Sequence, residues 1–470
     1  MVTGNSTADV QLEGAQEPAA DCREALIFIP GLTMEHVHSV EEISLLLADA
    51  MDRHAGSGRA KFRVGQVSEQ PLQGTGKTRW TTIFRKDGSQ EAPLVDVYEL
   101  EYFHLFQHKL LEESLLVKIS RIPAAVFPAS IKLFRHYRDK TLSQKEKLQF
   151  VMSFFGLLLI LLYAFLLLGA VVETVQGVLD LGKTEARQAA PATGTAAIST
   201  GAQPGVPAAR SPLASAWQWL VAALTTIWAW LQQAGTTVVV ILAGLGIVLP
   251  KSDKIRQMIA NFATIIIALI DYLQYGDRRP VLNGQILSLL EHIAEKPEVE
   301  YTRVNILAYS FGSILALDTL FPKESDVPKR VKTVKCLVTI GSPFDFIHML
   351  WPEYFARRTP LHGLKWFNIY SPTDVLSSNF RSHSKKVSAI GGEEEAPSQE
   401  KRLSNAAWLE PPMNIKYAVG GSDEDLSIWD VIHLVGFLNH GKYWDAEPET
   451  QYNAFDLAVP KMFKDSPVLR

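Results

Sequence analysis

A serine at position 310 stands where a strand-like run gives way to a helix-like pattern. Residues 305–309 are mostly apolar, and after the serine the apolar residues follow helical spacing. A sharp turn at this point would push Ser310 out of the sheet and expose its hydroxyl group. The backbone N–H of Phe311, at the start of the helix, can help to bind an oxyanion. The pattern therefore predicts that Ser310 is a nucleophile.

The five residues from Ala308 to Gly312 resemble the nucleophile elbow of the α/β-hydrolase superfamily, whose motif is G-x-S-x-G. Ala308 stands in place of the first glycine, and it is small enough to let the turn close. The alternative interpretation is a helix N-terminus that contains a serine by chance. The resemblance implies an α/β-hydrolase fold, in which helices flank a mostly parallel sheet, and a Ser-His-Asp triad.

A second oxyanion donor is expected near the start of the chain. Residues 25–30 form a short apolar run that ends in Pro30-Gly31, and such a run is typical of a buried strand. In the superfamily the loop after this strand supplies the second donor, so the resemblance implies the backbone N–H of Leu32 or of a near neighbour. The alternative is an ordinary strand-to-helix turn. An amphipathic helix should follow, with Ser39 as its N-cap and Glu42 completing a capping box.

The acid of the triad is expected just past a later strand. Residues 366–370 have a strand pattern, and Asp374 follows four residues later. The resemblance implies that Asp374 fixes the tautomer of the catalytic histidine and stabilises the imidazolium. An aspartate in a Ser-Pro-Thr-Asp turn is a structural alternative. Asp345, which follows an earlier strand-like run at 334–340, is a second candidate.

Two histidines follow the last expected strand, residues 415–419. His433 lies in a helix-like run, where a packed histidine is the usual case, whereas His440 lies in a loop-like position beside a glycine. The resemblance implies His440 as the base, with His433 as the alternative. Ser310, Asp374 and His440 occur in the chain order Ser, Asp, His that the superfamily uses. The resemblance covers residues 25–102 and 276–445.

Two uncharged stretches separate these halves. Residues 149–172 are mostly Leu, Phe, Ile and Val, and they are long enough to cross a bilayer core of about 30 Å. An Ala-, Gly-, Thr- and Pro-rich linker at 184–212 follows. The second stretch, 211–250, could cross twice. If strands on both sides of the insertion share one sheet, however, the number of crossings must be even, which favours one crossing within about 220–250. Basic residues are concentrated on the two flanks, so the positive-inside rule places both flanks in the cytoplasm.

These observations divide the chain into four parts. Residues 1–24 should be a disordered tail, 25–130 the first half of the α/β-hydrolase core, 131–275 the membrane insertion and 276–460 the second half of the core. The net charge of -4 gives no reason to expect a nucleic-acid partner. Two cysteines, Cys22 and Cys336, are too few for a disulfide framework or a zinc site.

The sequence therefore predicts an integral membrane protein with two crossings and a cytoplasmic serine hydrolase core. As an esterase or lipase it would cleave a lipid or other acyl ester at the bilayer and would need neither a metal nor an organic cofactor. The alternative is a catalytically silent α/β-hydrolase domain that acts as a membrane scaffold or binds a protein partner. A transport or channel component is disfavoured because neither predicted crossing contains an ionisable residue.

Overall fold

The strands of the described residues form one mixed sheet in the order β2-β4-β5-β1-β6-β7-β8-β9, with β3 also paired to β4. The computed structural model describes residues 23–32, 39–55, 61–72, 77–87, 89–102, 105, 269, 271–276, 278–351, 353–374, 376–380, 412–419, 439–446, 452–464 and 466–469. All of them belong to one compact unit, to which the chain contributes residues 1–162 and 263–470.

The strands are β1 (Arg23–Ile29), β2 (Lys61–Val64), β3 (Ser68–Pro71), β4 (Lys77–Asp87), β5 (Gln90–Leu100), β6 (Tyr301–Tyr309), β7 (Val334–Ile340), β8 (Lys365–Tyr370) and β9 (Met413–Lys416). The helices are α1 (Val40–His54), the π-helix η1 (Asp271–Tyr275), α7 (Arg279–Glu295), α8 (Phe311–Leu320), α9 (Phe344–Leu350), α12 (Ala454–Met462) and the short 3₁₀ segments η2 (Lys329–Thr333), η6 (Lys442–Trp444) and η7 (Pro467–Leu469).

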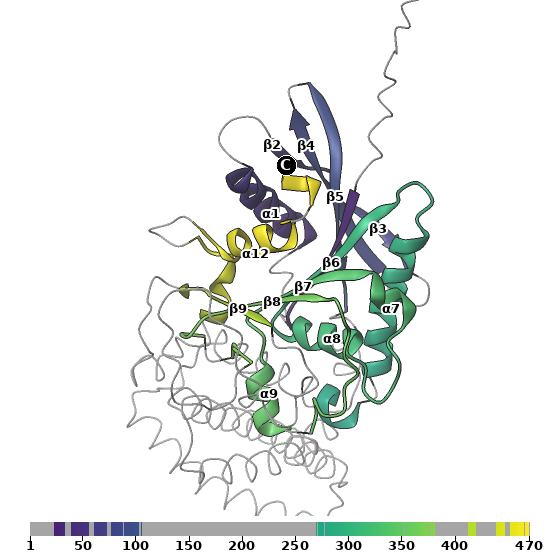
Figure 1. Cartoon of the computed structure of the whole chain (residues 1–470), viewed down its shortest axis with the longest axis vertical. Helices are drawn as coiled ribbons and strands as arrows, with labels where there is room; N and C mark the ends of the chain where they lie inside the picture. Colours follow the sequence, from purple (N-terminus) through teal and green to yellow (C-terminus); the bar gives the residue numbers. More distant parts are fainter. Residues whose placement is uncertain are drawn as a thin grey trace, which may run out of the picture. The chain divides into compact units, whose positions relative to one another are not determined.

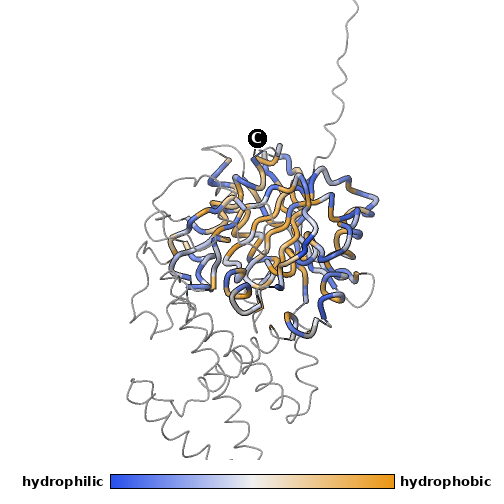
Figure 2. Tube along the Cα trace, turned by 60° about the horizontal axis from the view of Figure 1, so that its bottom comes forward, coloured by the Kyte–Doolittle hydropathy of each residue, from blue (hydrophilic) through white to orange (hydrophobic). Residues whose placement is uncertain are grey.

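Six neighbouring strands run parallel, in the order β5-β1-β6-β7-β8-β9. The strands β2, β3 and β4 form an antiparallel edge. The parallel strands are buried on both faces, which explains why β1, β6 and β7 read as nearly continuous apolar runs. Figure 2 shows these apolar strands in the middle of the described core. The expected α/β architecture with a mostly parallel sheet is therefore present.

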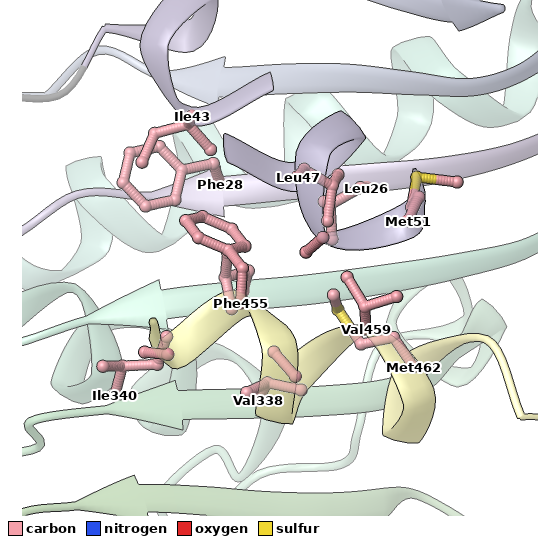
Figure 3. Close-up of a cluster of buried hydrophobic side chains, with 14 of the residues drawn as sticks. Leu26, Phe28, Ile43, Leu47, Met51, Val338, Ile340, Phe455, Val459 and Met462 are labelled. Atoms are coloured by element: carbon pink, nitrogen blue, oxygen red, sulfur yellow. The ribbon is translucent and has the colours of Figure 1, made fainter. Parts of the chain in front are cut away.

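Helices cover both faces of the sheet (Figure 1). On one face, α1 and α12 contact each other. Helix α1 packs over β2, β4 and β5, and α12 packs over β7 and β8. Figure 3 shows Leu47 and Phe455 from these helices near Leu26 and Phe28 of β1. On the other face, α7 packs on α8, and α8 packs on β1 and β6. This second layer positions the end of β6, where Ser310 lies.

The predicted N-cap of α1 is confirmed. Ser39 is the N-cap, and its hydroxyl oxygen accepts from the Glu42 N–H at 3.4 Å. The apolar residues at helical spacing, Val40, Ile43, Leu47 and Met51, are fully buried. The cap and this apolar stripe together explain where the helix starts and which side faces the sheet.

Two segments differ from what their sequence patterns indicate. Residues 61–67 have a strand-like pattern, but β2 ends at Val64 and β3 begins at Ser68, because the two segments pair with different parts of β4. Helix α12 was not predicted. Its N-terminus is nevertheless marked in the sequence by Asn453 and Asp456, which form a capping box.

Both sides of the predicted membrane insertion contribute to this sheet, because β1 lies between β5 and β6. The Asn305 amide on β6 donates to Glu24 Oε2 on β1 at 2.9 Å. The core also extends past the expected boundaries: β1 begins at Arg23, Tyr272 is buried, and η7 runs to Leu469.

Within the described ranges, no helix is long and apolar enough to cross a membrane. The predicted crossings at 149–172 and 220–250 and the linker at 184–212 lie outside the described residues, as do residues 1–22 of the predicted tail.

Candidate active site

Ser310 occupies a strained turn between β6 and α8. Its φ is 52° and its ψ is -125°, a backbone conformation that non-glycine residues rarely adopt. The Ser310 N–H donates to the Ile340 carbonyl at the end of β7 at 2.8 Å. Ala308, which occupies the position of the first glycine in the motif, lies within β6 and is fully buried.

Two glycines let the loop after β1 lie directly against this turn. A Cβ built on Gly312 would lie 2.3 Å from the Ile29 carbonyl oxygen, and one built on Gly31 would lie 2.9 Å from Ser310 Cβ. Real Cβ atoms do not approach so closely. Leu32 follows Gly31 and is buried, and Phe311 is the first residue of α8. The two predicted oxyanion donors therefore come from segments that meet at Ser310, while residues 33–38 of the predicted donor loop lie outside the described part of the chain.

The structure brings Ser310, His440 and Asp374 together in one hydrogen-bonded chain. His440 Nε2 lies 2.7 Å from Ser310 Oγ, and His440 Nδ1 lies 2.8 Å from Asp374 Oδ2. With its proton on Nδ1 directed at Asp374, the imidazole can accept the serine proton at Nε2. The His440 side chain is 13% exposed and that of Asp374 is fully buried. The arrangement can therefore deprotonate an alcohol at one end while the other end stays shielded from water.

Asp374 is held by further donors. The Tyr443 hydroxyl donates to Oδ2 at 2.9 Å, and the Leu376 N–H donates to Oδ1 at 2.9 Å. Tyr443 in turn accepts the Ser371 N–H at 3.0 Å. Hydrogen bonds from neutral donors to a carboxylate are stronger than those between neutral groups. They fix the carboxylate facing His440 Nδ1.

The alternative acid and base are placed elsewhere. Asp345 lies in the first turn of α9, and the carboxylate that contacts His440 is that of Asp374. His433, the alternative base, lies outside the described residues.

Three buried tyrosines, which the sequence analysis missed, secure the three loops of the site. Tyr102 donates to the Pro30 carbonyl at 2.7 Å, Tyr309 donates to the His440 carbonyl at 2.5 Å, and Tyr443 donates to Asp374. Burial raises the pKa of each phenol well above its usual value, so all three remain protonated donors at neutral pH. Their partners lie 69 to 131 residues away in the chain, which local sequence patterns do not reveal.

The region after β7, which could have formed a lid or an acyl-binding wall, is tightly packed where it is described. Phe344 and Phe355 are buried, with ring centroids 4.1 Å apart. Beside them the buried carboxylate of Asp318 on α8 pairs with Arg358 at 2.5 Å and accepts from Tyr272 at 2.5 Å. Tyr272 also packs edge-on against the Phe311 ring at 5.1 Å. This polar network supports α8, the helix that begins directly after Ser310.

A second polar cluster lies toward the other end of the parallel strands, that is, toward the edge of the sheet at which β1 and β6 begin. Asp96 is fully buried and accepts from Tyr301 at 2.5 Å and from Thr82 at 2.6 Å. Lys296 lies 3.5 Å from the same carboxylate, and its ammonium stands 3.8 Å from the centroid of the Trp80 ring. A cavity of about 470 Å³ opens beside it, lined among others by Trp80, His292 and Lys296.

No group of His, Cys, Asp and Glu among the described residues could hold a metal ion. Comparisons with protein-family models, with curated proteins and with solved structures found no match to this chain.

Proposed function

We propose that the protein is a serine hydrolase that cleaves an acyl ester through an acyl-enzyme intermediate. The single observation that carries this proposal is the chain of hydrogen bonds from Ser310 through His440 to Asp374, with distances of 2.7 and 2.8 Å. Because Ser310 also lies in a strained strand-to-helix turn, the site combines two features that favour such catalysis: a hydroxyl group held at a sharp turn and an oriented base.

In the proposed reaction, Ser310 Oγ attacks the acyl carbonyl while His440 Nε2 takes its proton. The tetrahedral intermediate then collapses, the C–O bond to the alcohol breaks, and His440 returns the proton to the leaving oxygen. Water, deprotonated by His440, then attacks the acyl-enzyme. The bond between the acyl carbon and Ser310 Oγ breaks, His440 returns the proton to Ser310, and the acid is released. Asp374 holds the imidazole and stabilises its charged form. No step of this sequence calls for a metal or an organic cofactor.

The oxyanion would form beside Ser310, and the proposed donors are the backbone N–H groups of Phe311 and Leu32. Support comes from the close packing of Gly312 against the end of β1, which leaves the start of α8 and the loop after β1 on the same side of the nucleophile. Tyr102 holds the Pro30 carbonyl just before this loop, which favours a preformed donor site.

The α/β-hydrolase fold is part of the proposal. It is supported by the parallel strands β5 to β9, by helices on both faces, and by a nucleophile placed directly after a central strand. Asp374 follows β8 and His440 follows β9, so the order Ser, Asp, His also agrees with the fold.

A membrane-anchored form acting on lipid-derived esters is the finer version of this proposal. Its support is the pair of uncharged stretches at 149–172 and 220–250, together with the position of β1 between β5 and β6. Since one sheet contains strands from both sides of the insertion, two crossings would return the chain to the cytoplasmic core. Reporter fusions at Gly201 and at the C-terminus should then report opposite sides of the membrane; the same side for both would contradict this topology.

A fluorophosphonate probe tests the catalytic proposal directly. The detergent-solubilised full chain should become covalently labelled, Ser310→Ala should not, and His440→Ala should label at least 100-fold more slowly. The matched control is Ser44→Ala, because Ser44 is a buried serine on α1 outside the site. Equal labelling of the parent protein and Ser310→Ala would overturn the proposal. Absence of labelling in a folded parent protein would instead favour the catalytically silent scaffold.

A further inference from the structure

Tyr309 touches the proposed base in two ways. Its ring lies nearly parallel to the His440 imidazole, with centroids 5.3 Å apart and planes at 23°. Its hydroxyl group donates to the His440 backbone carbonyl at 2.5 Å. Because Tyr309 is the last residue of β6 and precedes Ser310, one residue links the strand of the nucleophile to the segment that carries the base.

We propose that Tyr309 is a positioning residue for His440: it fixes the plane of the imidazole beside Ser310 and stabilises the imidazolium that forms during proton transfer. This inference rests on the proposed function and assigns a role to a residue that the triad mechanism does not use.

The positioning argument follows from the geometry of the imidazole. Its two nitrogens bind different partners, Nε2 at Ser310 and Nδ1 at Asp374, and these bonds fix the direction of the line through both nitrogens more firmly than the tilt of the ring about that line. The Tyr309 ring contacts one face of the imidazole and restricts that rotation. The Tyr309 hydroxyl group holds the backbone of His440 in place. Misplacement of a catalytic group by about 1 Å can cost about 100-fold in rate.

The electrostatic argument concerns the proton that His440 receives. An aromatic face within about 6 Å of a cation attracts it, and the Tyr309 ring meets that distance. Among the described residues, the imidazole also contacts the Ser310 hydroxyl and the Asp374 carboxylate, and the Tyr443 ring lies with its centroid 6.4 Å away and its plane perpendicular. Asp374 and Tyr309 therefore support the charged form from the edge and from the face of the ring.

Two substitutions separate these effects. Tyr309→Phe keeps the ring and loses the hydrogen bond, so labelling by the fluorophosphonate probe should slow about 3- to 10-fold with the same pH profile. Tyr309→Leu loses both, so labelling should slow about 10- to 100-fold. With the aromatic face gone, the protonated imidazole loses a favourable contact. The midpoint of the acidic limb of the rate profile should therefore fall by about half a pH unit.

Tyr301→Phe and Tyr301→Leu are the matched controls, since Tyr301 is a hydrogen-bonded tyrosine at the other end of the same strand. They should lower thermal stability while the labelling rate of the folded protein and its pH midpoint stay at the parent values. A parent-like rate and midpoint in Tyr309→Leu would overturn this inference while leaving the triad intact. If Tyr309→Leu does not fold, a parent-like rate in Tyr309→Phe would overturn the hydrogen-bond role. A parent protein that labels no faster than Ser310→Ala would overturn the proposed function and this inference together.

Discussion

The sheet has one edge at which the parallel strands end and one at which they begin. Each of these two edges contains a buried carboxylate, and the two carboxylates have different partners. At the edge where the parallel strands end, Asp374 binds His440, and the chain of hydrogen bonds continues outward to the Ser310 hydroxyl. Toward the edge where β1 and β6 begin, Asp96 accepts from Tyr301 and Thr82 and lies close to Lys296. The first cluster ends at the hydroxyl group of a serine in a strained turn, whereas the polar groups of the second cluster bind one another.

The difference shows why burial and charge alone do not define an active site. The Asp96 cluster has a cation, an aromatic ring and an adjacent cavity, yet its Lys296 is already held by a carboxylate and by the Trp80 ring. The Ser310 cluster has a strained backbone and a histidine whose second nitrogen contacts the Ser310 hydroxyl group. Strain and direction, rather than the number of polar groups, distinguish the two edges.

The largest expected effect separates the two carboxylates. Asp374→Asn should lower the labelling rate by about 10⁴-fold, because an amide no longer selects the productive tautomer of His440. Asp96→Asn should leave the labelling rate of the folded protein unchanged and lower the free energy of unfolding by about 3 kcal/mol, because Lys296 loses its charged partner. Labelling kinetics and thermal unfolding of both variants measure these effects. A loss of labelling in folded Asp96→Asn would erase the distinction between the edges.

A pair of glycine substitutions tests how closely the site is packed. Gly312→Ala would place a Cβ 2.3 Å from the Ile29 carbonyl, so it should destabilise the fold by about 2 to 4 kcal/mol and slow labelling. Gly284→Ala on α7 meets no atom within 4 Å and should stabilise the helix by about 0.5 to 1 kcal/mol. Thermal unfolding compares them. Equal stability of the two variants would show that α8 does not approach β1 as described.

A smaller effect is expected when Asp374 loses one of its donors. Tyr443→Phe removes the hydroxyl hydrogen bond to Oδ2 and should lower the labelling rate about 3- to 10-fold. Tyr98→Phe, at the edge with Asp96, removes a hydroxyl that binds Tyr301 and should affect stability alone. Rates are to be compared at equal concentrations of folded protein. A similar slowing in both variants would argue against a specific role for Tyr443.

The smallest expected effect concerns Glu24, a fully buried residue of β1. Burial raises the pKa of Glu24 above its usual value, so folding favours its protonated form. The stability that it contributes is therefore complete below its unfolded pKa of about 4.3 and is lost as pH rises through the raised folded value. Glu24→Gln should gain stability relative to the parent protein between pH 4 and pH 8. Thermal unfolding at both pH values measures this, and a pH-independent difference would contradict it.

Sequence patterns predicted the parts of the site that are local. Ser310 was identifiable because strand, turn and helix follow one another within a few residues, and Asp374 and His440 because each follows a strand-like run. Tyr309, Tyr443 and Tyr102 carried no such signal, since their partners are fixed by tertiary packing. The order of the strands in the sheet could not be predicted either, because β1 pairs with β6, a strand that lies far away in the sequence.

That pairing has a consequence for how the protein is made. The Asn305 side chain that binds Glu24 is synthesised 281 residues later. At about 5 to 20 residues per second, the ribosome needs roughly 15 to 55 s to cover this interval. During that time β1 lacks its neighbour β6, and an apolar strand edge without its partner can pair with other chains. The sheet can therefore be completed, and Ser310 can reach its position at the end of β6, only late in synthesis.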